Sequence, residues 1–246
     1  MHLERVVDVF LELARQLYYH GSNATEIEKY ISDAALAYNL EVQIASIGTV
    51  IYLTVVDKKG KSITRIERIQ NTSIDFNKLE QWENLIKKMI SETPPISFVR
   101  DDILILKYEQ NKIIRSMPIN IIAVFIASFS FSFVFKGGFF EGIASGIVGT
   151  IVYLLTMRIK NKIFKDFMAG FLLHTLIKIL SLYYSINPFP TLAGAVMVFV
   201  PGLLLTNGIM EIGDRNLVSG SSKLLEAIFV LGALVMGAGI SAAFWR

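Results

Sequence analysis

Long apolar stretches dominate the chain from Ser116 onward, and they constrain its fold more than any other feature. Each stretch approaches or exceeds the roughly 20 residues that an α-helix needs to cross a bilayer. We identify five, at residues 117–135, 138–157, 167–186, 190–210 and 222–244. The pattern predicts an α-helical integral membrane protein with five transmembrane helices.

Charged residues divide the chain in the same way. Residues 1–115 carry 31 Asp, Glu, Lys and Arg residues, whereas residues 116–246 carry 14. We therefore expect a cytoplasmic domain at 1–115 and a transmembrane domain at 116–246. The net charge of +3 comes without a long basic run, which argues against nucleic-acid binding. The chain has no cysteine, so disulfides and thiolate metal sites are excluded.

The N-terminal part is predicted to be a small α+β domain with the element order ααβββαα. Apolar residues recur at helical spacing through residues 2–20. Asn23 and Asp75 stand where the caps of the second and third helices are expected. Pro94-Pro95 opens the fourth helix. Lys58-Lys59-Gly60 separates two β-rich segments and predicts a hairpin turn.

Basic residues gather on one side of the apolar stretches. They are Lys112, Arg115, Arg158, Lys160, Lys162, Lys165, Arg215 and Lys223. The other side carries Lys136 and Arg246. Because cytoplasmic loops are rich in Lys and Arg, we expect a cytoplasmic N-terminus and an outside C-terminus in the cell (plasma or inner) membrane. The N-terminal sequence predicts an amphipathic helix rather than a signal peptide.

The fourth apolar stretch contains a polar interruption. Pro201-Gly202 is expected to break the helix, because proline lacks a backbone donor and glycine allows close approach. Thr206 and Asn207 follow and offer side-chain donors and acceptors. We predict that these four residues belong to a solute path. The alternative is a packing kink, which membrane helices tolerate.

Ionisable residues within apolar helices are costly and often functional. His174 and Lys178 are four residues apart and therefore share a helix face. The functional interpretation is a proton-coupling histidine beside a lysine in the substrate path that attracts a carboxylate. Alternatively, Lys178 snorkels to the interface and His174 only packs. Glu141 and Glu226 are either gating or proton sites or helix-start carboxylates stabilised by the dipole.

The spacing of Gly142 and Gly146 predicts close helix packing, either within the chain or against a partner. No catalytic constellation, metal-binding pattern or cofactor motif is recognised. Glu211, Asp214 and Glu226 lack a neighbouring nucleophile or metal set, which argues against an intramembrane enzyme.

The chain resembles the threonine/serine exporter family over nearly its whole length. The residues that carry the resemblance are Gly21 and Glu28, Ser46-Ile47-Gly48-Thr49, Phe135-Lys136-Gly137-Gly138 with Glu141, and Pro201-Gly202, Asn207, Glu211-Ile212, Ser219-Gly220, Lys223 and Glu226-Ala227. The block from Pro201 to Ala227 is the most specific. Family members usually have Asp at Glu141 and Glu211, Arg at Lys223, and Gly-Asp at Arg215-Asn216.

The chain is similar to the larger, soluble-domain-bearing component of the two-protein form of this family. That form is associated with dicarboxylate (succinate) export, and the long single-chain form with threonine and serine export. The resemblance implies a secondary transporter component, a lipid environment, and a smaller family partner or a homo-oligomer. Glu211 and Lys223 are then gating residues on an inner rim that the N-terminal domain can touch. The alternative is a membrane-anchored ligand-sensing or regulatory protein.

Overall fold

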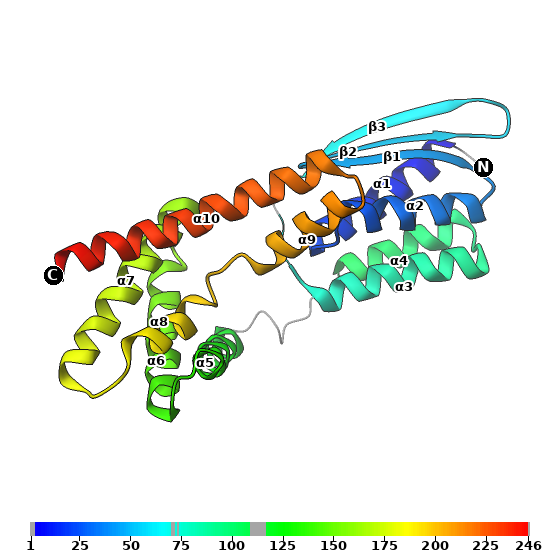
Figure 1. Cartoon of the computed structure of the whole chain (residues 1–246). Coiled ribbons are helices and arrows are strands. Elements are labelled where there is room, and N and C mark those ends of the chain that lie inside the picture. The colour runs from blue at the N-terminus through cyan, green and yellow to red at the C-terminus, as the bar shows by residue number, and fades with distance from the viewer. Residues whose placement is uncertain (1–2, 70–71, 73, 109–116, 246) are drawn as a thin grey trace. The chain divides into compact units, whose positions relative to one another are not determined.

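The computed structural model describes residues 3–69, 72, 74–108 and 117–245. The chain divides into two compact units, whose elements are labelled in Figure 1. Unit 1 consists of Met1–Gln110 and Thr206–Leu224. Unit 2 consists of Asn111–Leu205 and Leu225–Arg246. A segment near the C-terminus of the chain therefore packs with the N-terminal residues.

Unit 1 is arranged around its first helix. Its N-terminal elements are α1 (Leu3–His20), α2 (Ala24–Ala37), β1 (Glu41–Ile47), β2 (Val50–Val56), β3 (Ser62–Arg68), α3 (Phe76–Glu92) and α4 (Ile96–Tyr108). The strands form one antiparallel sheet in the order β1-β2-β3. Helix α1 contacts α2, α3, α4, β2 and β3, so it is the central element of the unit.

Local sequence signals account for several boundaries in unit 1. The side chains of Asn23 and Asp75 each accept a hydrogen bond from the N–H three residues on, at 2.8 and 3.1 Å. These contacts satisfy helix N–H groups that have no partner within the helix. In the β2–β3 turn, Gly60 has a φ of +77°, which glycine adopts without strain. The two predicted caps and the predicted hairpin turn are confirmed.

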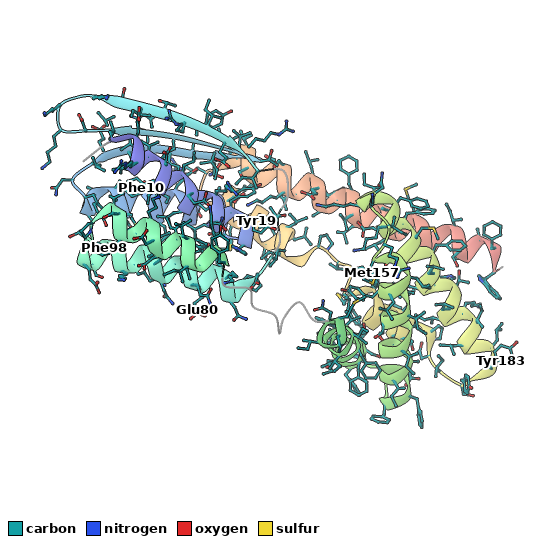
Figure 2. All side chains as sticks on the ribbon, turned by 180° about the vertical axis from the view of Figure 1, so that it is seen from behind. Phe10, Tyr19, Glu80, Phe98, Met157 and Tyr183 are labelled. Atoms are coloured by element: carbon teal, nitrogen blue, oxygen red, sulfur yellow. The ribbon has the colours of Figure 1, made fainter. Side chains whose placement is uncertain are left out.

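Unit 2 is a bundle of apolar helices. Its elements include α5 (Met117–Val134), α6 (Phe139–Thr156), α7 (Lys162–Tyr183) and α8 (Pro188–Val196). Helix α8 packs against α5, α6 and α7. Val152, Leu173 and Ile177 are buried at the centre of this unit, whereas many large side chains, such as Tyr183, project outward (Figure 2). Helices α9 (Gly202–Gly213) and α10 (Leu217–Phe244) contribute residues to both units.

Within the described residues, three helices are long and apolar enough to cross a membrane, namely α5, α6 and α10. The stretch predicted at 167–186 overlaps α7, which ends at Tyr183 and is not among the three. The stretch predicted at 190–210 is divided between α8 and α9, with residues 197–201 between them outside any α-helix. Pro201 accounts for this interruption, because it has no N–H to donate to the preceding turn.

Two sets of sequence expectations fall outside the described residues. The predicted domain boundary between residues 115 and 116 lies there, together with the basic residues Lys112 and Arg115. Arg246, which was expected on the outer side, lies there as well.

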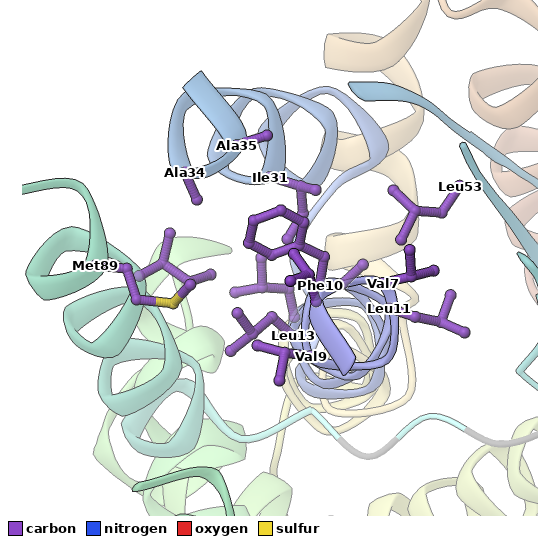
Figure 3. Packing of buried hydrophobic residues seen from close by; sticks show 14 of the residues in the cluster. Val7, Val9, Phe10, Leu11, Leu13, Ile31, Ala34, Ala35, Leu53 and Met89 are labelled. Carbon is purple, nitrogen blue, oxygen red and sulfur yellow. The ribbon is translucent and has the colours of Figure 1, made fainter. Parts of the chain in front are cut away.

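The core of unit 1 joins side chains from α1, α2, β2, α3 and α4, and Figure 3 shows part of it. Phe10 and Leu13 come from α1, Ile31 from α2, Leu53 from β2 and Met89 from α3, and all five are fully buried. Phe10 and Leu13 share one face of α1, because their spacing is close to one helical turn. Burial of this cluster holds the helices on the sheet.

We expect Phe10→Ala to destabilise unit 1 by about 3–5 kcal/mol, because it leaves a cavity in a close-packed core. Phe98→Ala is the matched control, since Phe98 is 63% exposed on α4, and should change stability by less than about 0.5 kcal/mol. Denaturant unfolding followed through the buried Trp82, in a Trp245→Phe background, measures both. Equal effects of the two substitutions would contradict the described core.

Candidate functional site

Helices α9 and α10 form a tight hairpin within unit 1. A Cβ at Gly220 would lie only 2.7 Å from the carbonyl oxygen of Gly208, so a side chain there would push the helices apart. In the turn, Arg215 has a φ of +65°. Non-glycine residues pay a steric cost in this left-handed region, which glycine does not. The glycine that the family resemblance places at this position suits the observed turn.

The carboxylate of Glu211 fixes this hairpin to the N-terminus of α2. Glu211 is fully buried, and its Oε1 accepts a hydrogen bond of 2.6 Å from the Ala24 backbone N–H. The same oxygen accepts a hydrogen bond from the Lys223 ammonium on α10. The first N–H groups of a helix have no partner within it, and the helix dipole favours a negative charge there. Two predicted gating residues, Glu211 and Lys223, thus form one ion pair, in which the carboxylate is fully buried and the lysine side chain is 13% exposed.

Further polar contacts flank this ion pair. The side-chain amide of Asn207 donates to the Gly21 carbonyl oxygen at 3.3 Å. The amide of Asn216 donates to Glu28 Oε1 at 3.4 Å, and the Ser46 backbone N–H donates to the same oxygen at 2.9 Å. The α9–α10 hairpin therefore meets Gly21 and α2 through polar groups, and Glu28 of α2 is in turn hydrogen-bonded to β1.

We call this set of contacts the polar junction. It comprises Gly21, Ala24, Glu28, Ser46, Asn207, Glu211, Asn216 and Lys223. Three separate sequence blocks that carry the family resemblance meet here. Chemically, this arrangement holds the Glu211–Lys223 charge pair in one position against the N-terminus of α2.

In unit 2, His174 and Lys178 line one cavity of about 220 Å³. Its other walls are apolar and come from Ile177, Pro188, Phe189 and Leu192. His174 Nδ1 lies 2.9 Å from the hydroxyl oxygen of Ser241 on α10. A positive charge and a titratable ring thus face the same small space, which suits a small charged metabolite rather than a drug-sized ligand.

Glu141 joins the N-termini of α6 and α8. Its two carboxylate oxygens accept hydrogen bonds from the backbone N–H groups of Gly138 and Asn187, each at 3.0 Å. Glu226 instead makes a 3.8 Å ion pair with Lys162, in which both side chains are largely exposed. Such exposed pairs contribute little to stability. Glu226 belongs to unit 2, whereas the Glu211–Lys223 pair belongs to unit 1.

The predicted solute-path residues of the fourth stretch are also divided between the units. Pro201 and Gly202 belong to unit 2, at the break and at the first residue of α9. Thr206 is exposed and Asn207 contacts Gly21, and both belong to unit 1.

Gly142 and Gly146 lie where α6 meets α5. A Cβ on Gly142 would lie 3.0 Å from the Phe129 ring, and one on Gly146 would lie 2.7 Å from the Phe125 ring. Both glycines therefore allow close packing of these two helices within the chain.

Sequence reasoning missed Thr175, Asn216 and Ser241 as members of these sites. Each is a single polar residue without a local motif, and its partner lies 66 to 188 residues away. No signal in one sequence could have joined them.

We expect Glu211→Gln to destabilise unit 1 by about 3–5 kcal/mol, because it leaves the Lys223 ammonium buried without its counter-charge. Adding Lys223→Met should recover much of this loss, since the uncompensated charge is then removed. Glu226→Gln in the exposed pair is the control, with an expected effect below about 1 kcal/mol. Denaturant unfolding and hydrogen exchange at the Ala24 N–H measure these effects. Unchanged exchange at Ala24 in Glu211→Ala, which removes the accepting oxygen, would contradict the observed contact.

The family model described as "Putative threonine/serine exporter" (ThrE) matches residues 8–245. No curated protein and no solved structure matches the chain significantly. The family match extends over both units, so it includes the polar junction and the His174–Lys178 cavity. Among the described residues, the structure also has three helices long and apolar enough to cross a membrane. The match over residues 8–245 shows that the chain belongs to the threonine/serine exporter family.

Proposed function

We propose that the chain is a component of a secondary transporter that exports small carboxylate-bearing metabolites. The solutes are threonine and serine, or a dicarboxylate such as succinate, and the proton gradient drives their export. The observation that carries this proposal is the cavity shared by His174 and Lys178. The family match supports a transport role rather than an enzymatic one.

Lys178 is the residue proposed to attract the solute. A lysine within an apolar helix is costly, so its position calls for a partner of opposite charge. The ammonium can form a charge-assisted hydrogen bond with a carboxylate. Apart from Lys178 and His174, the residues that line the cavity are apolar. His174 is the proposed proton-coupling residue, because its ring titrates near neutral pH when unperturbed.

The proposed topology has five membrane crossings, formed by α5, α6, α7, the interrupted pair α8–α9, and α10. The positive-inside pattern supports a cytoplasmic N-terminus and an outside C-terminus. The interruption at residues 197–201 supports a solute path along Pro201, Gly202, Thr206 and Asn207, because broken helices expose backbone groups to solutes in transporters.

The Glu211–Lys223 pair is the proposed inner gate, since it is a buried charge pair on a helical hairpin. Glu141 is proposed for the outer gate, because it ties the start of α6 to the start of α8. Glu226 is a further proton or gating candidate near the start of the last crossing. A smaller membrane protein of the same family, or a second copy of this chain, is the proposed partner on the basis of the family resemblance.

The direct test is solute accumulation in cells that lack the gene. We expect intracellular serine, threonine or succinate to rise in these cells and to fall again when the gene is restored. The assay is run with and without a second small membrane protein of the family, which tests the partner. Unchanged levels of all three solutes in both arms would contradict the exporter proposal for these solutes.

We expect Lys178→Met to lower export by about tenfold or more, because a lost charge-assisted contact is worth about 1.5–3 kcal/mol. Lys178→Arg should retain most export, since it keeps the positive charge. Lys160→Met is the control, because Lys160 is an exposed lysine just before α7. Initial efflux rates at equal protein levels measure all three. Full activity of Lys178→Met would remove this residue from the solute path.

A further inference from the structure

Ser241 links α10 to α7 through a buried hydroxyl. Its side chain is fully buried, and its Oγ lies 2.9 Å from His174 Nδ1 and 2.7 Å from Thr175 Oγ1. All three residues belong to unit 2. A hydroxyl buried among apolar side chains is unfavourable unless it is hydrogen-bonded, so these two contacts determine how Ser241 is oriented.

The hydrogen bonds form a series from His174 through Ser241 and Thr175 to the Phe171 carbonyl oxygen. The direction of each bond follows from that carbonyl oxygen. Thr175 Oγ1 lies 2.8 Å from the Phe171 carbonyl oxygen, which can only accept, so Thr175 donates its single hydroxyl hydrogen there. The hydrogen between Thr175 and Ser241 must then come from Ser241. With that hydrogen used, Ser241 Oγ can only accept from His174. His174 Nδ1 must therefore carry a hydrogen.

We propose that Ser241 and Thr175 are positioning residues that hold neutral His174 in the Nδ1–H tautomer. Nε2 then keeps the lone pair and is the nitrogen that takes up a proton. The tautomer of a histidine is set by the hydrogen bond that its other nitrogen makes. The tautomer itself follows from the hydrogen bonds. Only the role of the His174 proton in export rests on the proposed transport function.

The charges around His174 are few. Lys178 lines the same cavity from the same helix. Helix α8 carries no ionisable side chain, and α6 contributes Glu141, which is bonded to Gly138 and Asn187, and Tyr153. Within unit 2, the described part of α10 contributes Glu226, which is paired with Lys162. A proton on Nε2 therefore changes the charge of the cavity by one unit directly beside Lys178.

Nitrogen-15 NMR of the full-length chain in lipid tests the tautomer directly. The protein is labelled at its 3 histidines, and the His174 signals are assigned by their loss in His174→Gln. At a pH where the ring is neutral, we expect a protonated-type shift for Nδ1 and an unprotonated-type shift for Nε2. Ser241→Thr should retain this pattern and Ser241→Ala should lose it. An Nε2–H tautomer in the wild-type chain, or an unchanged pattern in Ser241→Ala, would overturn the inference.

The pH profile of export provides the second readout. The hydrogen bond to Ser241 is stronger when the ring is charged, so Ser241→Ala should move the pH of half-maximal export down by roughly half a unit to one unit. Thr175→Val should move it less, and Ser241→Thr should restore the wild-type profile. Ser221→Ala, an exposed serine of the same helix, should leave it unchanged. A Ser241→Ala profile that coincides with the wild-type profile would overturn the functional role of the tautomer.

The export assay and the NMR experiment test two different claims, so one can be wrong without the other. Absence of export by the wild-type chain would count against the proposed function, whereas the NMR pattern would still decide the tautomer. An Nδ1–H pattern supports the inference in either case.

Discussion

The buried carboxylate of Glu211 is the interaction on which the organisation of unit 1 depends. It places a negative charge at the N-terminus of α2 and compensates it with Lys223 from the other arm of the hairpin. Its second oxygen, Oε2, is buried without a hydrogen-bond donor among the described residues, so the charge relies on these two contacts. Removing either one leaves an uncompensated group out of water, which is far more costly than losing an exposed pair.

Two buried hydroxyls in unit 2 are hydrogen-bonded to backbone carbonyl oxygens. Ser145 donates to the Ser128 carbonyl oxygen at 2.9 Å, and Thr191 donates to the Asn187 carbonyl oxygen at 2.8 Å. These bonds satisfy buried hydroxyls inside the helix bundle. The cavity that His174 and Lys178 line is different, because there polar groups border a space large enough for a small solute. The proposed transport role depends on this cavity, and not on the hydroxyls that are hydrogen-bonded inside the helix bundle.

Local features of the fold could be predicted from the sequence, whereas the assembly of the sites could not. Asn23 and Asp75 signal helix starts because a cap acts within one turn, and Pro201 signals a break for the same reason. The contact between Ala24 and Glu211 joins residues 187 apart, and nothing in either segment specifies the other. The start of α7 at Lys162 was also missed, because charged residues precede its apolar part and resemble a loop. Helical spacing predicts a shared face for His174 and Lys178, and both line one cavity, whereas Ser241 comes from another helix.

The central claim is that this chain moves small carboxylates by means of the proton gradient. Efflux from proteoliposomes tests it most directly, with the purified chain alone or together with the proposed smaller membrane protein, and with labelled serine, threonine and succinate loaded inside. Our account predicts efflux of at least one solute that accelerates when a pH gradient is imposed and disappears when the gradient is collapsed. Folded, reconstituted protein that releases none of the three, with or without the gradient, would contradict it.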